Sequence, residues 1–356
     1  MYSQWRRRQR RAAAAAVLGT VLVLPFSAHA MSLSLTEAID TALAANTALR
    51  ITAEGERSAD AALKQARGKN SISAEAGDTL RTSKAKDEDA QTSNSLSLSA
   101  RLPLYSGGAN EANIKSGEIG AQSARLTTER AREDLKYEVI TAYWDAVEAS
   151  KKVEVQRDTV NKYDAHLKNV TALYDAGAQA KIDVLRSSVE LSNARQELIS
   201  AENSYEVNLA TLRNLLNIAR TEPLTLTTEV TYQPFEKPME DCISYAYRNR
   251  LDLTVERAKL RQRELAIESA RAGYRPSVSL TLGTGLSSQF HPRHDTSSDV
   301  SASVGVSWNI FDSGVTRGAI EEAEAERDIA LLNVQKAEET IDLNLRKAYL
   351  NMREAE

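Results

Sequence analysis

Residues 139–174 read VITAYWDAVEASKKVEVQRDTVNKYDAHLKNVTALY. Alternating steps of three and four residues along this stretch follow one row of apolar side chains, which only Gln156 interrupts. The row consists of Val139, Ala142, Ala146, Ala149, Val153, Val160, Tyr163, Leu167, Val170 and Tyr174. An apolar row that repeats every 3.5 residues is typical of a coiled-coil seam, because slight underwinding keeps the row facing a partner helix. The stretch therefore predicts a long helix packed against a second one.

The predicted helix extends beyond the seam, because no proline occurs from Asn110 to Tyr174. At 1.5 Å per residue this run would be roughly 95 Å long, far more than a compact domain needs. The turn 175–178 (DAGA) follows, and then a second proline-free run from Gln179 to Glu222. Its weaker apolar row comprises Val184, Ser187, Leu191, Ala194, Leu198, Ala201, Tyr205, Asn208, Leu212 and Leu215. We therefore predict an antiparallel helical hairpin over residues 110–217 that turns at Gly177.

The composition indicates thin helices and an exported chain. Aromatic residues make up only 5% of the 356 residues, which favours long thin helices over a thick core. Residues 1–30 are typical of a signal peptide, with arginines at 6–11, an apolar stretch at 12–24 and the A-x-A cleavage site 28–30. Cleavage would change the formal charge from −4 to −9, since all five charges lost are arginines. This charge argues against nucleic acid as a partner, and the single Cys242 excludes an intramolecular disulfide.

A shorter helix and a β-hairpin are predicted before the long helix. Residues 34–66 carry an apolar face at helical spacing, with Thr36 as the cap and Glu37 in the first turn. From residue 71 the period changes to two, and apolar side chains alternate with polar ones on both sides of the charged loop 84–91. Two such runs joined by a polar loop predict a β-hairpin over residues 71–105.

The same order of elements then returns. A displacement of 204 residues pairs Ile39 with Ile243 and Leu49 with Leu253, and one of 206 pairs residues 104–108 with 310–314. We therefore predict an internal tandem duplication. Its first repeat spans residues 31–222, 223–240 form a linker, and the second repeat spans 241–356 with a helix, a hairpin at 276–311 and a long helix. A complete second repeat would end near residue 423, so we expect a C-terminally truncated chain.

The second hairpin shows the alternation most clearly. In residues 277–286 and 300–310 one face is apolar, and the other carries serine, threonine and glycine with almost no charge. Small polar residues fit a curved lumen better than the surface of a soluble sandwich, and about ten residues let a tilted strand cross a bilayer. Tyr105, Trp308 and Phe311 stand at strand ends, where membrane-interface aromatics belong. The pattern favours an α+β membrane protein with four transmembrane strands.

Four strands cannot close a barrel on their own. An open strand edge in lipid leaves backbone groups without hydrogen-bond partners, at a cost of several kcal/mol each. Closure must therefore come from further copies of the chain. Three copies would supply twelve strands, an even number within the range of known membrane barrels.

Several loose motifs occur in a specific order and spacing. The strand-to-helix passages 102–108 (LPLYSGG) and 308–314 (WNIFDSG) are the most specific. Others are 142–144 (AYW), 174–177 (YDAG) with 182–185 (IDVL), 212–217 (LRNLLN) and 270–277 (ARAGYRPS). Together they resemble the TolC-like outer membrane efflux protein family, and the correspondence covers nearly all of the mature chain.

This resemblance implies a homotrimer in the cell outer membrane, whose 12-stranded β-barrel continues as a helical barrel, or tunnel, through the periplasm. Such a trimer is a passive export duct for efflux or type I secretion. Its implied partners are outer membrane lipid, a periplasmic adaptor (membrane fusion) protein and an inner membrane transporter of the RND, ABC or MFS type. The turn at Gly177 then resembles an adaptor-docking tip, with Asp175, Ala178, Lys181 and Asp183 beside it. Gate residues at a second tip would lie beyond residue 356.

Other candidate sites carry weaker patterns. Gly107, Gly108 and Gly314 follow strands without the lysine of a phosphate-binding loop, so we expect them to bend the chain from strand into helix. His291 and His294 lack a third ligand, which favours a surface turn over a metal site. No catalytic set stands out, so we predict neither catalysis nor a cofactor. The competing interpretation is a periplasmic coiled-coil structural or adaptor-like protein with soluble β-hairpins.

Overall fold

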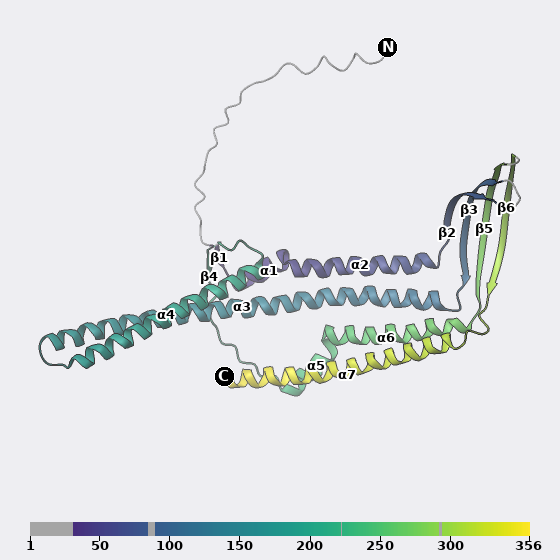
Figure 1. The fold of residues 1–356 in the computed structure, drawn as a ribbon. Coiled ribbons are helices and arrows are strands. Elements are labelled where there is room, and N and C mark those ends of the chain that lie inside the picture. Colours follow the sequence, from purple (N-terminus) through teal and green to yellow (C-terminus); the bar gives the residue numbers. More distant parts are fainter. Residues whose placement is uncertain (1–30, 85–89, 222, 292–293) are drawn as a thin grey trace, which may run out of the picture.

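The computed structural model describes residues 31–84, 90–221, 223–291 and 294–356. These residues form an elongated molecule, with a β-sheet at one end and the turn of a helical hairpin at the other (Figure 1). The helices are α1 (Leu35–Ala45), α2 (Thr47–Lys69), α3 (Ala109–Asp175), α4 (Lys181–Leu216), α5 (Met239–Asn249), α6 (Leu251–Arg271), the 3-10 turn η1 (Ala272–Tyr274) and α7 (Val315–Ala355). The strands are β1 (Met31–Leu33), β2 (Ser73–Ser83), β3 (Gln91–Tyr105), β4 (Leu224–Leu226), β5 (Ser277–His291) and β6 (Asp295–Ser307).

Helices α3 and α4 form the antiparallel pair that the sequence predicts. Seam residues of α3, from Val139 to Val153, are buried together with Val170, while Gln156 and Tyr163 are half-buried. From α4 the buried partners include Leu191, Ala194, Ala201 and Leu212. Alanine recurs in both rows, at Ala142, Ala146 and Ala149 of α3 and at Ala194 and Ala201 of α4, and these small side chains let the two helices approach closely.

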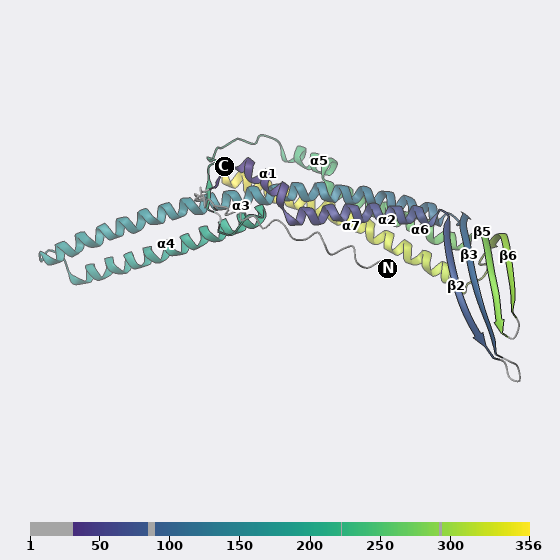
Figure 2. The same cartoon turned by 90° about the horizontal axis from the view of Figure 1, so that it is seen from above.

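The sheet combines the two hairpins. Its order is β2-β3-β5-β6, and all neighbouring strands are antiparallel. Strands β2 and β6 therefore form the two edges. The helices follow the same order, since α2 packs on α3, α3 on α6 and α6 on α7, and the four run side by side toward the sheet (Figures 1 and 2). Short strands β1 and β4 pair in parallel near the middle of the molecule.

The prediction of one helix over residues 34–66, capped by Thr36, was wrong on two points. The cap is Ser34, whose hydroxyl accepts from the Glu37 amide while the Glu37 carboxylate accepts from the Ser34 amide in a capping box. The helix also breaks at Asn46, where ψ is 128°. The Asn46 side chain caps α2 and donates to the Leu215 carbonyl oxygen (3.0 Å), so a contact with α4 fixes the break. The single helix predicted at the start of the second repeat likewise breaks, at Arg250.

Several local geometries recur at the displacements of 204 and 206 residues. The ion pair Arg67–Glu118 (2.9 Å) returns as Arg271–Glu324 (3.3 Å). The helix break at residue 46 returns at 250, with ψ of 128° and 122°. The strand register 76 to 98 returns as 280 to 304. Corresponding residues of the two halves therefore occupy similar local positions.

A buried tyrosine holds the centre of the molecule. Tyr143 of α3 lies in the largest hydrophobic cluster, where α1, β1 and β4 cover the α3–α4 pair. Its hydroxyl donates to the Leu33 carbonyl oxygen (2.9 Å) and accepts from the amides of Thr227 (3.2 Å) and Thr228 (3.0 Å). One side chain thus satisfies three backbone groups beside the β1–β4 pair.

We expect Tyr143→Phe to destabilise this centre by about 1 kcal/mol, because the Thr228 amide loses its hydrogen bond, while the Thr227 amide and the Leu33 carbonyl oxygen keep only the bond to each other (3.2 Å). Hydrogen exchange followed by mass spectrometry should show faster exchange in the peptide that contains Thr227 and Thr228, chiefly from the Thr228 amide. Tyr137→Phe is the matched control, since Tyr137 lies on the same helix and is 71% exposed. Unchanged exchange at residues 227 and 228 would contradict the role assigned to Tyr143.

An ion-pair cluster joins the two halves. Arg130 of α3 lies 2.8 Å from the Asp252 carboxylate, and Arg250 lies 2.7 Å from it. Partial burial raises the pKa of Asp252, but hydrogen bonds and charges from Arg250 and Arg130 outweigh it and hold the pKa well below its usual value. The charged form of Asp252 therefore stabilises the contact between α3 and α6.

Asp252→Asn should lower the free energy of unfolding by about 1 kcal/mol at pH 7, since solvent screens a partly exposed cluster. Because the pKa of Asp252 is lower in the folded state, its carboxylate stabilises the fold at pH values above the unfolded pKa, which is near 4. This stabilisation is lost as the pH falls from the unfolded pKa toward the lower folded pKa. The difference from the unaltered protein should therefore narrow below pH ~4 in thermal melts followed by circular dichroism. Asp158→Asn, at an exposed position of α3, is the control. A difference that stays constant down to acidic pH would refute this account.

Candidate membrane wall and docking tip

The strand registers place the alternating residues on two distinct faces of the sheet. Pairs such as Leu102–Leu280 and Leu280–Val304 bring aliphatic side chains together across three strands. The opposite face carries serine, threonine and glycine, for example in the pairs Ser99–Gly283 and Gly283–Ser301. The apolar face also has polar members, which are Asp78, Thr82, Thr92, Asn94, Thr284 and Ser288 on the first three strands and Thr296 and Ser298 at the start of β6.

The apolar face lies open. Leu80 is 71% exposed and Val300 is 86% exposed. Contiguous exposed apolar surface of this kind marks a site of contact with lipid or with another protein. The outer edges of β2 and β6 have no partner strand among the described residues. The sheet thus resembles a segment of wall, apolar on one side and hydrophilic on the other.

The three predicted interface aromatics lie at the helical end of this sheet. Tyr105 ends β3, and Trp308 and Phe311 follow β6. The Trp308 indole N–H donates to the Tyr274 carbonyl oxygen (3.0 Å), while its ring remains 59% exposed. Phe311 is 84% exposed. A tryptophan whose N–H is hydrogen-bonded and whose ring is exposed suits the boundary between water and hydrocarbon.

The three glycines predicted to bend the chain have positive φ angles, with 69° at Gly107, 96° at Gly108 and 91° at Gly314. They stand between a strand and the helix that follows it. Ser313 shares this conformation with φ of 54°, although it carries a side chain. Each hairpin thus passes into its long helix through two successive residues in the left-handed region.

Two capping residues at these bends escaped the sequence analysis. The Ser106 hydroxyl accepts from the Asn110 amide (3.0 Å), and the Asp312 carboxylate accepts from the Thr316 amide (2.8 Å). Hydrogen bonds from the Thr316 hydroxyl and amide lower the pKa of Asp312 from its ordinary value. The signal that could have identified both caps is a serine or aspartate three residues before the first helical residue, Ala109 or Val315.

The predicted tip is a Schellman turn. The Gly177 amide donates to the Tyr174 carbonyl oxygen (2.9 Å) and the Ala178 amide to the Leu173 carbonyl oxygen (2.8 Å). Gly177 has φ of 75°, and a Cβ placed there would meet no atom within 4 Å. The left-handed backbone, rather than crowding, therefore calls for glycine.

The side chains of the tip reach solvent. Asp175, Ala178 and Lys181 are exposed and Asp183 is half-buried near the start of α4. The structure thus brings these predicted residues to one turn. It adds three exposed aliphatic residues that the sequence analysis did not select: Leu173, Ile182 and Leu185. The sequence signal that could have identified these three residues is their position outside the two predicted seam rows.

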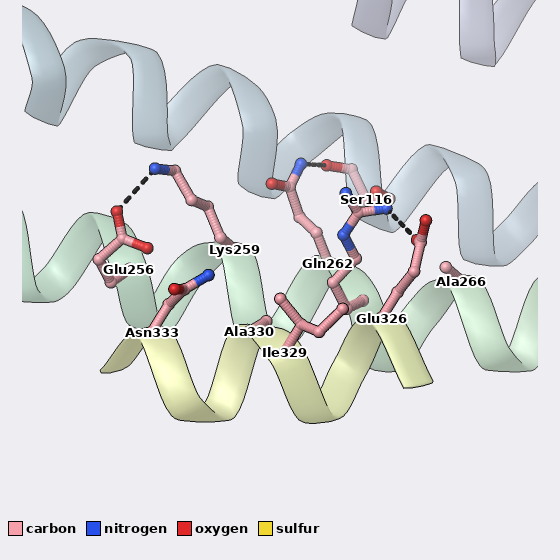
Figure 3. Close-up of a pocket in the computed structure, with 10 residues that line it drawn as sticks. Ser116, Glu256, Lys259, Gln262, Ala266, Glu326, Ile329, Ala330 and Asn333 are labelled. Atoms are coloured by element: carbon pink, nitrogen blue, oxygen red, sulfur yellow. Dashed lines mark hydrogen bonds and ion pairs between the residues drawn. The ribbon is translucent and has the colours of Figure 1, made fainter. Parts of the chain in front are cut away.

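A groove of about 460 Å³, lined by both charged and aliphatic side chains, lies where α3, α6 and α7 meet (Figure 3). Its charged residues pair with one another, Lys259 with Glu256 and Arg263 with Glu326. Gln262 points across the groove and donates to the Ser116 carbonyl oxygen of α3 (2.9 Å). These contacts join helices and leave the paired charges neutralised, so the groove serves as a helix junction.

Among the helices that the structure describes, none combines the length and apolar character needed to span a bilayer. Within the same ranges, no three His, Cys, Asp or Glu side chains gather as a metal site would require. The signal peptide predicted for residues 1–30 lies outside the described residues. The surface turn predicted at residues 291–294 lies partly outside the described residues, because the His291 side chain and residues 292–293 are not described.

Comparison with known sequences identifies relatives. The profile described as outer membrane efflux protein matches residues 38–217 and 242–356. Protein CyaE of Bordetella pertussis is 27% identical over 337 residues, which cover 91% of this chain and 70% of CyaE. Outer membrane protein TolC of Escherichia coli is 23% identical over 148 residues, which cover 42% of this chain and 30% of TolC.

Solved structures share the fold. The outer membrane channel CmeC of Campylobacter jejuni superposes with a TM-score of 0.76 at 16% identity, covering 86% of this chain and 68% of CmeC. At that identity the likeness concerns the fold alone. The family profile, however, matches both halves of the chain, including the two hairpins and the long helices. The chain therefore belongs to the outer membrane efflux protein family.

Proposed function

We propose that copies of this chain assemble in the outer membrane into a closed β-barrel, which continues as a helical tunnel and acts as a passive duct for efflux or secretion. The observation that carries this proposal is the four-stranded sheet, which has an open apolar face and two unpaired edges. In hydrocarbon every backbone donor and acceptor needs a partner. Edges β2 and β6 can both be satisfied only if sheets join into a ring.

Three copies are the assembly that we propose, with four strands from each giving a barrel of twelve. The recurring geometries support an internal duplication, with residues 31–222 and 241–356 as the two repeats. A trimer would then consist of six similar units around one axis. Tyr105, Trp308 and Phe311 would lie at the interface between the membrane and the periplasm.

The helical end faces the periplasm in this proposal, after export through an N-terminal signal peptide. An exposed turn flanked by Leu173, Ile182 and Leu185 supports docking of a periplasmic adaptor protein. The adaptor would link the duct to an inner membrane transporter of the RND, ABC or MFS type. No step in such a duct needs catalysis, and specificity for the cargo would reside in the transporter.

Conductance tests the proposal directly. The full chain, purified in detergent and added to a planar bilayer, should open discrete ion-conducting channels. Val304→Asp should reduce insertion, because it places a charge on the apolar face of β6, at a cost below the roughly 2–4 kcal/mol of an arginine or lysine near the midplane. Ser303→Asp is the matched control, since Ser303 lies on the opposite face of the same strand. Absence of channels, or extraction of the protein from cells without detergent, would favour a periplasmic coiled-coil protein instead.

The tip is tested separately. Gly177→Val should weaken adaptor capture in a pull-down by roughly tenfold, because a β-branched residue at positive φ costs about 1–2 kcal/mol and distorts the turn. Gly177→Asn should retain capture, since asparagine tolerates this conformation. Unchanged capture by both variants would argue against docking at this turn.

A further inference from the structure

The polar face of the sheet carries an unbalanced negative charge. We propose that Asp299 of β6 makes the barrel wall pass cationic cargo more readily than anionic cargo. The inference rests on the proposed duct, in which the polar face of each sheet lines the lumen. It adds a preference by charge to the choice of cargo that the transporter makes.

The polar face offers a passing cargo hydroxyl groups and charge. Apart from its charged members it consists of serine, threonine, glycine and glutamine, and Pro103 is its one apolar member among the paired residues that the structure describes. An apolar compound would therefore find no apolar patch to bind on this face. Charge is the property by which such a wall can distinguish cargoes.

Most charges of this face are balanced by a neighbour of opposite sign. The charged members are Glu75, Arg81, Arg101, Asp295 and Asp299. The register makes Glu75 and Arg101 diagonal neighbours on adjacent strands, close enough for long side chains to offset each other's charge. Arg81 and Asp295 belong to one row across the four strands near the hairpin loops. Asp299 is left without a counterpart.

Asp299 stands in a row that holds no other charge. This row runs from Gly77 through Ser97 and Gly285 to Asp299. The rows of the two arginines lie four residues away along the strands, in opposite directions, which is about 13 Å. This separation exceeds the Debye length of about 10 Å in 0.1 M salt. The carboxylate is therefore uncompensated at its own level of the wall.

The carboxylate lies along the wall and is open to solvent. Asp299 is exposed, and a Cβ placed on Gly285 would lie 2.7 Å from the Asp299 Oδ1 atom. The glycine thus leaves the space beside β5 that the carboxylate occupies. A charge held in this position acts on passing ions through its field and leaves the lumen free.

The field of such a charge reaches the axis of a narrow barrel. Twelve strands spaced about 4.8 Å apart and tilted by about 40° form a barrel of roughly 12 Å radius. This radius is close to the Debye length in 0.1 M salt and roughly four times the Debye length in 1 M salt. Three copies of Asp299, screened over this distance, would favour a monovalent cation over an anion by about threefold in 0.1 M salt.

Reversal potentials of the full chain in a planar bilayer test this inference. Under a salt gradient centred near 0.1 M, the ratio of potassium to chloride permeability should fall about threefold in Asp299→Asn. In about 1 M salt the variant and the unaltered protein should differ little, because the Debye length shrinks to about 3 Å. Ser303→Asp adds a carboxylate to the same face of β6 and should raise the ratio.

Asp78→Asn is the matched control. Asp78 lies in the neighbouring row but on the apolar face of the sheet, so its replacement leaves the charge of the lumen as it is. The permeability ratio should stay the same. An equal fall in Asp78→Asn and in Asp299→Asn would overturn the role assigned to Asp299.

Short peptides extend the test to a larger cargo. In about 0.1 M salt, an oligolysine peptide should block the current of the unaltered duct more strongly than an oligoglutamate peptide of the same length. Asp299→Asn should reduce the difference between the two peptides. Equal block by both peptides in the unaltered duct would contradict a preference for cationic cargo.

The outcomes separate this inference from the proposed duct. Channels whose permeability ratio is the same with aspartate or asparagine at position 299 would overturn the inference and leave the duct intact. A chain that forms no channels would overturn both. A ratio that falls in Asp299→Asn, rises in Ser303→Asp and loses its dependence on Asp299 at high salt would establish the charge preference.

Discussion

Hydrogen bonding of strand edges is the constraint on which the rest of this structure depends. A sheet with one apolar face can be covered by lipid, but its edge groups cannot be satisfied there. Strands β2 and β6 leave two such edges in a single chain. The open apolar face and the two unpaired edges therefore support the assembly that we propose, and the chain belongs to the outer membrane efflux protein family.

The helices are constrained by the thickness of the helical layer rather than by the hydrogen bonding of edges. In the tunnel that we propose, the wall would be thin and would leave no room for a large core. Small seam residues such as Ala142 and Ala146 let α3 and α4 approach closely, and large buried side chains concentrate around Tyr143. The hydroxyl of Tyr143 ties β1 and β4 to α3 at mid-length. The largest buried hydrophobic cluster therefore lies at the centre of the molecule, while apolar side chains of the sheet and of the tip remain exposed.

Local patterns in the sequence predicted the elements, whereas long-range contacts escaped it. The seam, the period-two strands and the turn at Gly177 each depend on neighbours within a few residues, so the sequence contains their signals. The break at Asn46 depends on the Leu215 carbonyl oxygen, and the pairing of Arg130 with Asp252 joins residues far apart in the chain. The spacing of apolar residues along the sequence carries no information on such long-range contacts. The exposed tip residues Ile182 and Leu185 were missed although both lie outside the predicted seam rows.

The bends at the ends of the two hairpins connect the sheet to the long helices. Gly107 with Gly108, and Ser313 with Gly314, turn the chain from strand to helix through the same two left-handed residues. The ion pairs beside them, Arg67–Glu118 and Arg271–Glu324, hold similar helix spacings. In the assembly that we propose, a ring of strands would pass into a ring of helices, so every unit would have to turn the chain in a similar way. Ser313 tolerates a positive φ that its side chain disfavours, which is the cost of keeping the two turns alike.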